Sequence, residues 1–315
     1  MPDPPIVHWD NVEGRRSELG HLAAEWRDLG RAAGTVRVGL KRLRIDPGKW
    51  STPAHVEGAE EEIVFVLGGS GLSWQDGKVY ELREGDCVVH KPSAEAHTLR
   101  GGDDGLDVLI YGTRVPLQVA DLPRADVAWI FPTWTEAGTA DHPWAREVAA
   151  GEPEVGEPQP RPANIVNVHE LELMEWVPSD DIGISATFIA RHAGATLSGL
   201  SLDVMHPGKR NSLHHCHAAE EELFVVWEGD GICYLGDDEH PVRAGDVIAR
   251  PAGTGVAHSF RGGSNGMKLL LYSNKDPNDI AYFPKSNKIY FRGLRLIGRI
   301  ERLEYMDDEL TPGHL

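Results

Sequence analysis

Residues 214–227, HHCHAAEEELFVVW, combine metal-binding side chains with strand-like spacing. His215 and His217 are two positions apart, so both imidazoles point to the same face of a β-strand. Glu222 then begins an apolar run with the composition of a second strand, and a later strand-like segment, VAHSF, contributes His258. Three imidazoles and one carboxylate that meet at one point form a site for a divalent transition metal.

The same pattern occurs earlier in the chain. PGKWSTPAHVEGAEEEIVFVLGGSG begins at Pro47 and aligns with PGKRNSLHHCHAAEEELFVVWEGDG, which begins at Pro207, 160 residues later. A one-residue insertion then aligns His97 with His258. A repeat of this length predicts two domains of like fold. The first candidate metal site consists of His55, Glu57, Glu62 and His97, and the second consists of His215, His217, Glu222 and His258.

The second copy resembles the paired signature motifs of the cupin superfamily, G-x(5,6)-H-x-H-x(4)-E-x(6)-G followed by G-D-x(n)-P-x(n)-H. The matching positions are Gly208, His215, His217, Glu222, Gly229, Gly245, Pro251 and His258. The resemblance implies a bicupin, a chain with two β-barrels that each enclose a ligand cavity and often one metal ion.

Two alternatives stay open within this motif. The gap after Gly208 is one residue longer than in the commonest form of the pattern, so His214 is an alternative first ligand. His215 and His217 are preferred, because with His214 the second ligand position falls on Cys216. Glu61 and Glu221, each one residue before the preferred glutamate, are alternative ligands. The acidic runs Glu60-Glu61 and Glu220-Glu221 also suit solvated turns. His90 matches nothing in the repeat and is expected on the surface or in a loop.

Short apolar segments alternate with turns rich in Gly, Pro and Asp, which is typical of antiparallel barrels. We therefore expect an all-β fold with two cupin (jelly-roll β-barrel) domains, an N-terminal helix and a Pro-rich inter-domain linker. The expected boundaries are an N-terminal arm and helix at 1–37, cupin domain 1 at 38–114, a linker at 115–165, cupin domain 2 at 166–275 and a strand-like tail at 276–315.

Three expectations concern the segments around the barrels. The helix is expected within SELGHLAAEWRDLGRAAG, residues 17–34, because its apolar residues follow helical spacing. The tail is expected to return and pair with an exposed barrel edge. The aromatic residues of the linker are expected to pack between the domains, namely Trp129, Phe131, Trp134 and Trp144.

The two candidate sites differ in charge. With a divalent ion, the second site carries a formal charge of +1 and the first is neutral, because Glu57 stands where the second copy has His217. A neutral site polarises bound water or substrate less, which favours chemistry at the second site. The expected cofactor is a divalent transition metal (Fe, Mn, Ni or Zn), and the carboxylate-rich first site favours harder ions such as Mn.

Composition limits the partners. A formal net charge of −18 argues against nucleic acid and against an anionic membrane surface. The absence of a long apolar run and of a signal-peptide pattern suggests a cytoplasmic protein. The three cysteines, Cys87, Cys216 and Cys233, are odd in number and widely spaced, which predicts free thiols. A small-molecule substrate is the expected partner, and cupins commonly pair as homodimers.

The leading hypothesis is a metal-dependent dioxygenase, an oxidoreductase for a small organic and possibly aromatic substrate. Its centre is the domain 2 metal, with Glu222 acting as a base toward a bound hydroxyl. The first alternative is a metal-dependent isomerase of a sugar or sugar phosphate, or a decarboxylase. For a phosphate, Lys49, Lys209 and Arg210 are candidate cations. The second alternative is a non-catalytic cupin that binds a small molecule.

Overall fold

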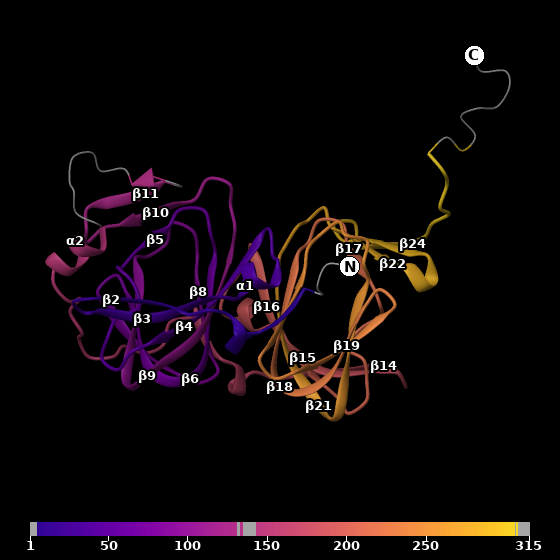
Figure 1. Cartoon of the computed structure of the whole chain (residues 1–315), viewed down its shortest axis with the longest axis horizontal. Helices are drawn as coiled ribbons and strands as arrows, with labels where there is room; N and C mark the ends of the chain where they lie inside the picture. Colours follow the sequence, from indigo (N-terminus) through magenta and orange to yellow (C-terminus); the bar gives the residue numbers. More distant parts are fainter. Residues whose placement is uncertain (1–4, 131–132, 135–142, 306, 308–315) are drawn as a thin grey trace, which may run out of the picture.

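The computed structural model describes residues 5–130, 133–134, 143–305 and 307. Two β-barrels lie side by side, the first drawn in indigo and magenta and the second in orange (Figure 1). The predicted all-β fold with two jelly-roll domains is confirmed. None of the helices among the described residues is long and apolar enough to cross a membrane.

The barrel of domain 1 is one antiparallel sheet of eight strands. Their bounds are β2 Arg15–Leu19, β3 Leu22–Asp28, β4 Val38–Ile45, β6 Glu62–Gln75, β7 Lys78–Arg83, β8 Asp86–His90, β9 His97–Thr113 and β13 Ile165–Asn167. The order is β13-β8-β6-β9-β4-β3-β2, and β7 pairs with β6. The register of β6 against β9 shifts near Gly68, so β6 bends and pairs with both ends of β9.

Domain 2 repeats this sheet. Its strands are β1 Ile6–His8, β14 Met174–Ser179, β15 Ile182–Thr187, β16 Ser198–Met205, β18 Glu222–Leu235, β19 Asp238–Arg243, β20 Asp246–Arg250 and β21 His258–Asn274. The order is β1-β20-β18-β21-β16-β15-β14, with β19 paired to β18.

The two halves exchange a strand. β1 precedes domain 1 in the chain but pairs with β20 of domain 2, with Ile6 opposite Ile248. β13 precedes domain 2 but pairs with β8 of domain 1, with Ile165 opposite Val88. Each exchanged strand covers an edge that would otherwise present unpaired backbone groups. The exchange ties the halves together by backbone hydrogen bonds as well as by side-chain packing.

The main hydrophobic core lies between the barrels. Along β6, Ile63 and Phe65 join this inter-domain core, whereas Val64 and Val66 point into the barrel of domain 1. β18 alternates in the same way and sends Phe224 and Val226 into its own barrel. Rings from the two domains meet in the shared core, with Tyr111 and Tyr272 at 4.9 Å and Phe65 and Trp227 at 5.2 Å between centroids. The domains therefore pack sheet against sheet.

Each barrel carries a second, small antiparallel sheet. In domain 1 it comprises β5 Val56–Glu57, β10 Val119–Leu122, β11 Val127–Ile130 and β12 Thr133–Trp134. In domain 2 it comprises β17 Cys216–His217, β22 Ile280–Phe283, β23 Lys288–Phe291 and β24 Leu296–Arg299. The tail thus returns to pair with domain 2, through β22 and β17. β10, which belongs to the expected linker, pairs with β5 of domain 1 in the same way.

The expected N-terminal helix is wrong over most of its length. Residues 15–28 form the β2–β3 hairpin, and only α1 Leu29–Ala33 is helical. β3 pairs with β4 and buries Leu22, so sheet pairing overrides the helical spacing. The other helices are short: α2 Pro143–Ala149, α3 Ile189–His192 and the 3-10 turns Trp9–Asn11, Val168–Glu170 and Pro284–Ser286.

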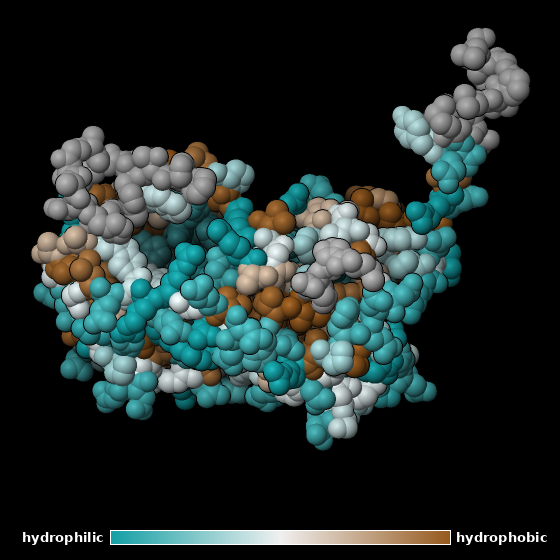
Figure 2. All heavy atoms as spheres, in the orientation of Figure 1, coloured by the Kyte–Doolittle hydropathy of each residue, from teal (hydrophilic) through white to brown (hydrophobic). Residues whose placement is uncertain are grey.

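The two linker aromatics whose side chains the structure describes do not lie between the domains as expected. Trp144 packs on a cluster of domain 1 that includes Leu22 and Trp50. Trp129 belongs to a small cluster with the residues of β10. Phe131 and the side chain of Trp134 lie outside the described residues. The Pro-rich stretch after α2 follows the surface of domain 1, where Arg161 pairs with Asp86. Hydrophilic side chains cover most of the face seen in Figure 2.

Candidate metal centres

The four predicted side chains of domain 2 come together at one end of the barrel. His217 lies on β17, Glu222 begins β18 and His258 begins β21. Nε2 of His258 lies 2.9 Å and Nε2 of His217 lies 3.4 Å from Oε2 of Glu222. The ring of His215 lies 4.8 Å from that of His258. These donors match the set expected for a divalent transition metal.

Neighbouring groups orient two of these histidines. Nδ1 of His217 lies 2.6 Å from Oδ2 of Asp279, and Nδ1 of His215 lies 2.7 Å from the carbonyl oxygen of Leu213. Since carboxylate and carbonyl oxygens only accept, both Nδ1 atoms carry the proton and both Nε2 atoms keep a lone pair for a metal. Nε2 of His217 is buried without a hydrogen-bond partner, so a bound cation would satisfy it.

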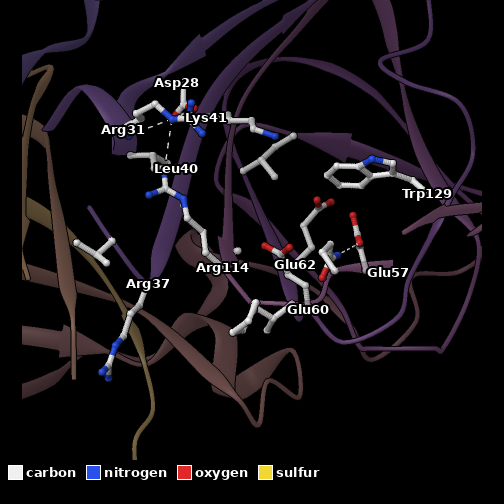
Figure 3. A pocket seen from close by; sticks show the side chains of 17 residues that line it. Asp28, Arg31, Arg37, Leu40, Lys41, Glu57, Glu60, Glu62, Arg114 and Trp129 are labelled. Atoms are coloured by element: carbon white, nitrogen blue, oxygen red, sulfur yellow. Dashed lines mark hydrogen bonds and ion pairs between the residues drawn. The ribbon is translucent and has the colours of Figure 1, made fainter. Parts of the chain in front are cut away.

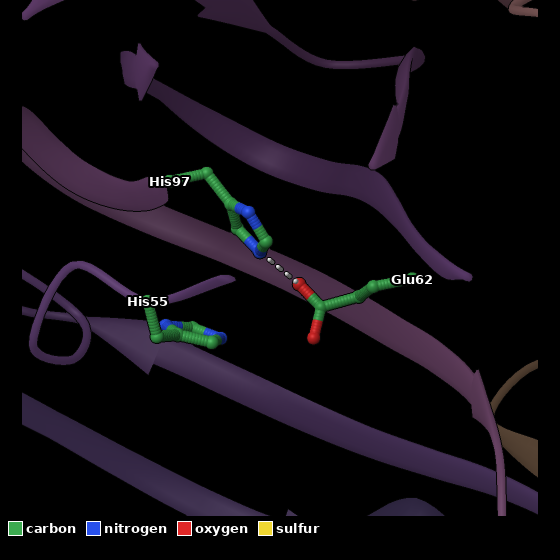
Figure 4. Close-up of side chains that lie close together, drawn as sticks. All are labelled: His55, Glu62 and His97. Carbon is green, nitrogen blue, oxygen red and sulfur yellow. Dashed lines mark ion pairs between the residues drawn. The ribbon is translucent and has the colours of Figure 1, made fainter. Parts of the chain in front are cut away.

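In domain 1, three of the four predicted side chains converge. His55, Glu62 and His97 point toward one another in Figure 4, and Nε2 of His97 lies 3.4 Å from Oε1 of Glu62. The rings of His55 and His97 lie 4.6 Å apart. Nε2 of His97 is buried without a hydrogen-bond partner, as is Nε2 of His217 in domain 2. Glu57 lies at the rim of this cluster, with Oε1 3.6 Å from Nε2 of His55.

Position 57 and its counterpart, position 217, have different hydrogen-bond partners in the two domains. Oε2 of Glu57 accepts a hydrogen bond from the amide of Gln118. Gln118 precedes β10 by one residue, and Asp279 precedes β22 by one residue, so the two occupy equivalent places. Domain 2 therefore pairs an imidazole donor with a carboxylate, and domain 1 pairs a carboxylate acceptor with an amide. The sequence motif includes neither Asp279 nor Gln118. Extending the repeat into the segments after each barrel would have found both.

Burial and neighbouring charges shift the pKa values of the ligands. Burial and the charge of His97 lower the pKa of His55 to about 4, and burial and His258 lower that of His215 to about 4. Burial alone would raise the pKa of Glu222, but His217 and His258 bring it to about 2. Burial would also raise the pKa of Glu62, but the nearby His97 lowers it to about 2. Neutral imidazole and ionised carboxylate are the forms that bind metal.

Glu57 and Glu60 have shifted pKa values in the opposite direction. Burial and the charge of Glu62 raise the pKa of Glu57 to about 7, and burial and Glu57 raise that of Glu60 to about 9. Glu57 is thus close to half protonated at neutral pH in the metal-free protein. In the metal-free protein the charge difference between the two centres is therefore smaller than a fully ionised Glu57 would give.

Several secondary expectations were wrong. His90 is buried, and its ring stacks on that of His97 at 3.7 Å, with Nδ1 2.8 Å from Glu95. Glu61 and Glu221 are fully buried and reach into the opposite domain, so they are neither solvated nor directed at the centres. His214 turns toward Ser259, with Nδ1 3.3 Å from Oγ, which leaves His215 as the residue facing the cluster. The predicted free cysteines are confirmed, and all three are buried.

A cavity of about 620 Å³ adjoins the domain 1 centre (Figure 3). Its wall combines four acidic residues, four basic residues and one aromatic residue, namely Asp28, Glu57, Glu60, Glu62, Arg31, Arg37, Lys41, Arg114 and Trp129. One end of the cavity is thus acidic and belongs to the candidate metal centre. The other end holds the four cations together with Asp28, which lies 3.5 Å from Nε of Arg31 and 3.8 Å from Nη2 of Arg114 and leaves that end with an excess of positive charge. Such a space suits a small anionic molecule that reaches a metal.

A smaller cavity of about 430 Å³ lies beside domain 2. His214, Arg210, Lys285 and Lys288 line it, but none of the four candidate ligands does. Phe283 lies between this cavity and the centre, because it lines the cavity and its ring lies 5.6 Å from that of His215. The complete ligand set and the larger cavity are therefore in different domains.

Comparisons with known proteins agree with this architecture. The cupin domain family matches residues 41–110 and 201–272. Oxalate decarboxylase from Bacillus subtilis has a similar structure, with a TM-score of 0.56 and 15% identity over 86% of this chain and 76% of that one. Oxalate decarboxylase from Lactobacillus farciminis, solved as a formate complex, gives a TM-score of 0.58 and 14% identity over 87% of both chains. A search of curated proteins found no match to the sequence. The two family matches and the two-barrel likeness identify the chain as a bicupin of the cupin superfamily.

Proposed function

We propose that the protein is a metal-dependent enzyme that converts a small organic acid without consuming dioxygen, as a decarboxylase or an isomerase does. The observation that carries the proposal is the cavity of domain 1, where cationic side chains and the carboxylates of a candidate metal centre share one space. An organic acid has complementary features, because its carboxylate suits the cations and its reacting end suits the metal.

His55, Glu62 and His97 would hold the ion in domain 1. A divalent ion bound there would act as a Lewis acid toward a substrate oxygen. Arg114 and Lys41, at the cationic end, would bind the substrate carboxylate. In a decarboxylation, the bond to the leaving CO₂ breaks and its electron pair stays on carbon. Burial and the charge of Glu57 raise the pKa of Glu60 to about 9, and Glu60 lines the cavity, so it is the group that would supply the proton that this carbon takes up.

Domain 2 would hold a second ion through His215, His217, Glu222 and His258. The formal charges favour chemistry in domain 2, whereas the cavity favours domain 1. We give the cavity more weight, because a substrate needs space beside the metal before charge can matter. In this proposal Glu222 is a metal ligand and not the catalytic base expected from the sequence.

The dioxygenase hypothesis has less support. The similar solved structures named above are oxalate decarboxylases. A further structure of the Bacillus subtilis enzyme comes from a study of its Mn(II) centres. At 14–15% identity these likenesses support the fold, and they make Mn²⁺ and small dicarboxylates the first metal and substrates to test. One observation still favours an oxygenase at domain 2, since the ring of Phe224 lies 5.3 Å from that of His258 and gives the centre an apolar side.

The test uses the full chain loaded with Mn²⁺ and a panel of small mono- and dicarboxylates that includes oxalate. Substrate and products are followed by NMR and CO₂ release, while an electrode measures dioxygen. The proposal predicts conversion of at least one acid without matching dioxygen consumption, and loss of that conversion in Lys41→Met with Arg114→Met. Stoichiometric dioxygen uptake would favour the oxygenase, and absence of any conversion across the panel would refute the proposed function.

A further inference from the structure

A buried carboxylate of domain 2 reaches into the wall of the domain 1 cavity. Glu221 is fully buried and lies one residue before Glu222. Its Oε1 accepts a hydrogen bond from the backbone N–H of Val36 at 2.8 Å. Its Oε2 accepts from the backbone N–H groups of Arg37 and of Val38, the latter at 2.9 Å. Three donors on one buried carboxylate make a strong, charge-assisted contact between the domains.

The segment held by Glu221 in turn holds a cation of the cavity. Val36 and Arg37 both line the cavity wall. The backbone N–H of Arg114 donates to the carbonyl oxygen of Arg37 at 2.6 Å, and Nη1 of Arg114 donates to the carbonyl oxygen of Thr35 at 2.5 Å. Both the backbone and the guanidinium of Arg114 therefore depend on where residues 35–38 lie.

We propose that Glu221 is a positioning residue for the domain 1 cavity, acting through residues 35–38 to hold Arg114 where it binds the carboxylate of the substrate. The inference rests on the proposed function for the identity of the bound anion. Since Glu221 is the neighbour of Glu222 in the chain, the ligand strand of domain 2 is part of the support of the substrate cavity of domain 1. This gives the second domain a role in the activity of the first without a substrate of its own.

The repeat provides a matched control. Glu61, the counterpart of Glu221, is also fully buried and accepts backbone hydrogen bonds from Thr196, Leu197 and Ser198 at 2.8, 3.2 and 2.9 Å. The same kind of contact thus also runs from domain 1 to domain 2. However, residues 196–198 line neither the 620 Å³ cavity nor the 430 Å³ cavity. Glu61→Gln and Glu221→Gln alter matching sets of backbone hydrogen bonds, and Glu61 also accepts from the hydroxyl groups of Thr196 and Ser198. The segment that Glu221 holds lines the 620 Å³ cavity, whereas the segment that Glu61 holds does not.

The experiment compares Glu221→Gln and Glu61→Gln in the full chain loaded with Mn²⁺. Oxalate binding is measured by titration calorimetry, backbone amide exchange by mass spectrometry and metal content by elemental analysis. We expect Glu221→Gln to weaken oxalate binding by about tenfold, the effect of a lost charge-assisted contact, and to speed exchange at Val36–Val38 and Arg114. Glu61→Gln should leave oxalate binding within about twofold and speed exchange at 196–198 instead.

Two results would overturn the inference. One is equal oxalate binding by the two variants at equal metal content, which would mean that the contacts of Glu221 and of Glu61 are both only structural. The other is an unchanged exchange rate at Arg114 in Glu221→Gln, which refutes the positioning role whether or not oxalate binds. Failure of the wild-type protein to bind oxalate or any other acid of the panel counts against the proposed function instead, so the two failures are distinguishable.

Discussion

Domain 1 and domain 2 are copies of one barrel whose candidate metal centres differ at two corresponding positions. Domain 2 has His217 held by Asp279 at 2.6 Å, and domain 1 has Glu57 held by Gln118. The first pair turns an imidazole lone pair toward the centre, and the second holds a carboxylate at the rim of a large cavity. A change of two side chains thus accompanies the difference between a centre with a complete nitrogen-rich ligand set and a centre that adjoins a cavity of about 620 Å³.

The largest expected effect concerns which centre carries turnover. Glu62→Gln should lower the rate of acid conversion by about a thousandfold, because it removes the carboxylate at the reacting centre. Glu222→Gln, the same substitution in domain 2, should lower it by less than about tenfold. Initial rates on the best acid of the panel measure both. If the larger loss follows Glu222→Gln, the assignment of the two domains is reversed.

The next effect tests the neighbours of the ligands. Asp279→Ala should weaken metal binding at domain 2 by about 10- to 100-fold, because His217 loses the acceptor that fixes its tautomer and orientation. Gln118→Ala should change metal affinity at domain 1 less, because Glu57 lies at the rim of the cluster formed by the other three residues. Competition titrations with a metal-sensitive dye give both affinities. Equal losses would show that Glu57 is a full ligand.

Exchanging the pairs should convert one centre toward the other. Glu57→His with Gln118→Asp gives domain 1 the donor set of domain 2, so its affinity for Zn²⁺ should rise relative to Mn²⁺ by about tenfold. Glu57→His alone should gain less, because the new imidazole lacks its carboxylate partner. The reverse pair, His217→Glu with Asp279→Gln, should shift domain 2 toward Mn²⁺. Unchanged selectivity in both double variants would mean that other residues set the metal preference.

The smallest effect is on stability and its pH dependence. Burial raises the pKa of Glu60 to about 9 in the folded protein, whereas the unfolded chain releases this proton near pH 4.5. Between these pH values the folded state binds more protons, so the free energy of unfolding of the metal-free protein decreases as pH rises. The loss is about 1 kcal/mol per pH unit, and Glu60→Gln should remove most of it above pH 7, whereas Glu57, with its pKa raised to about 7, still contributes below that pH.

The counterpart Glu220 forms an ion pair with Arg292 and supplies the control. Glu220→Gln should lower stability without removing the pH dependence seen in the wild-type protein. Urea unfolding at several pH values between 6 and 8.5 tests the prediction. It is contradicted if Glu60→Gln and the wild-type protein keep parallel curves.

The sequence predicts the barrels and the ligand clusters because both depend on local spacing. His215 and His217 share a strand face, and the turn to Glu222 has the same length in both copies. The whole pattern occurs twice in the chain, and a chance match would not be repeated in this way. For the same reason the alternation of Val64 and Val66 with Ile63 and Phe65 indicates which residues enter the barrel.

What the sequence did not predict depends on distant contacts. The helix expected at 17–34 failed because pairing with β4 decides the conformation of β3. The strand exchange has only a faint signal, the Ile-Val pair at residues 6–7 and again at 165–166. The roles of Glu61 and Glu221 needed the packing of one domain on the other, which no local pattern contains.

The most direct test is the number of metal ions per chain after dialysis from Mn²⁺, measured by elemental analysis for the wild-type protein, His97→Ala and His258→Ala. Because two separate clusters hold the ligands, we predict two ions in the wild-type protein and one in each variant. Equal metal content in all three proteins, or none in the wild-type protein, would contradict the assignment of these clusters as metal centres.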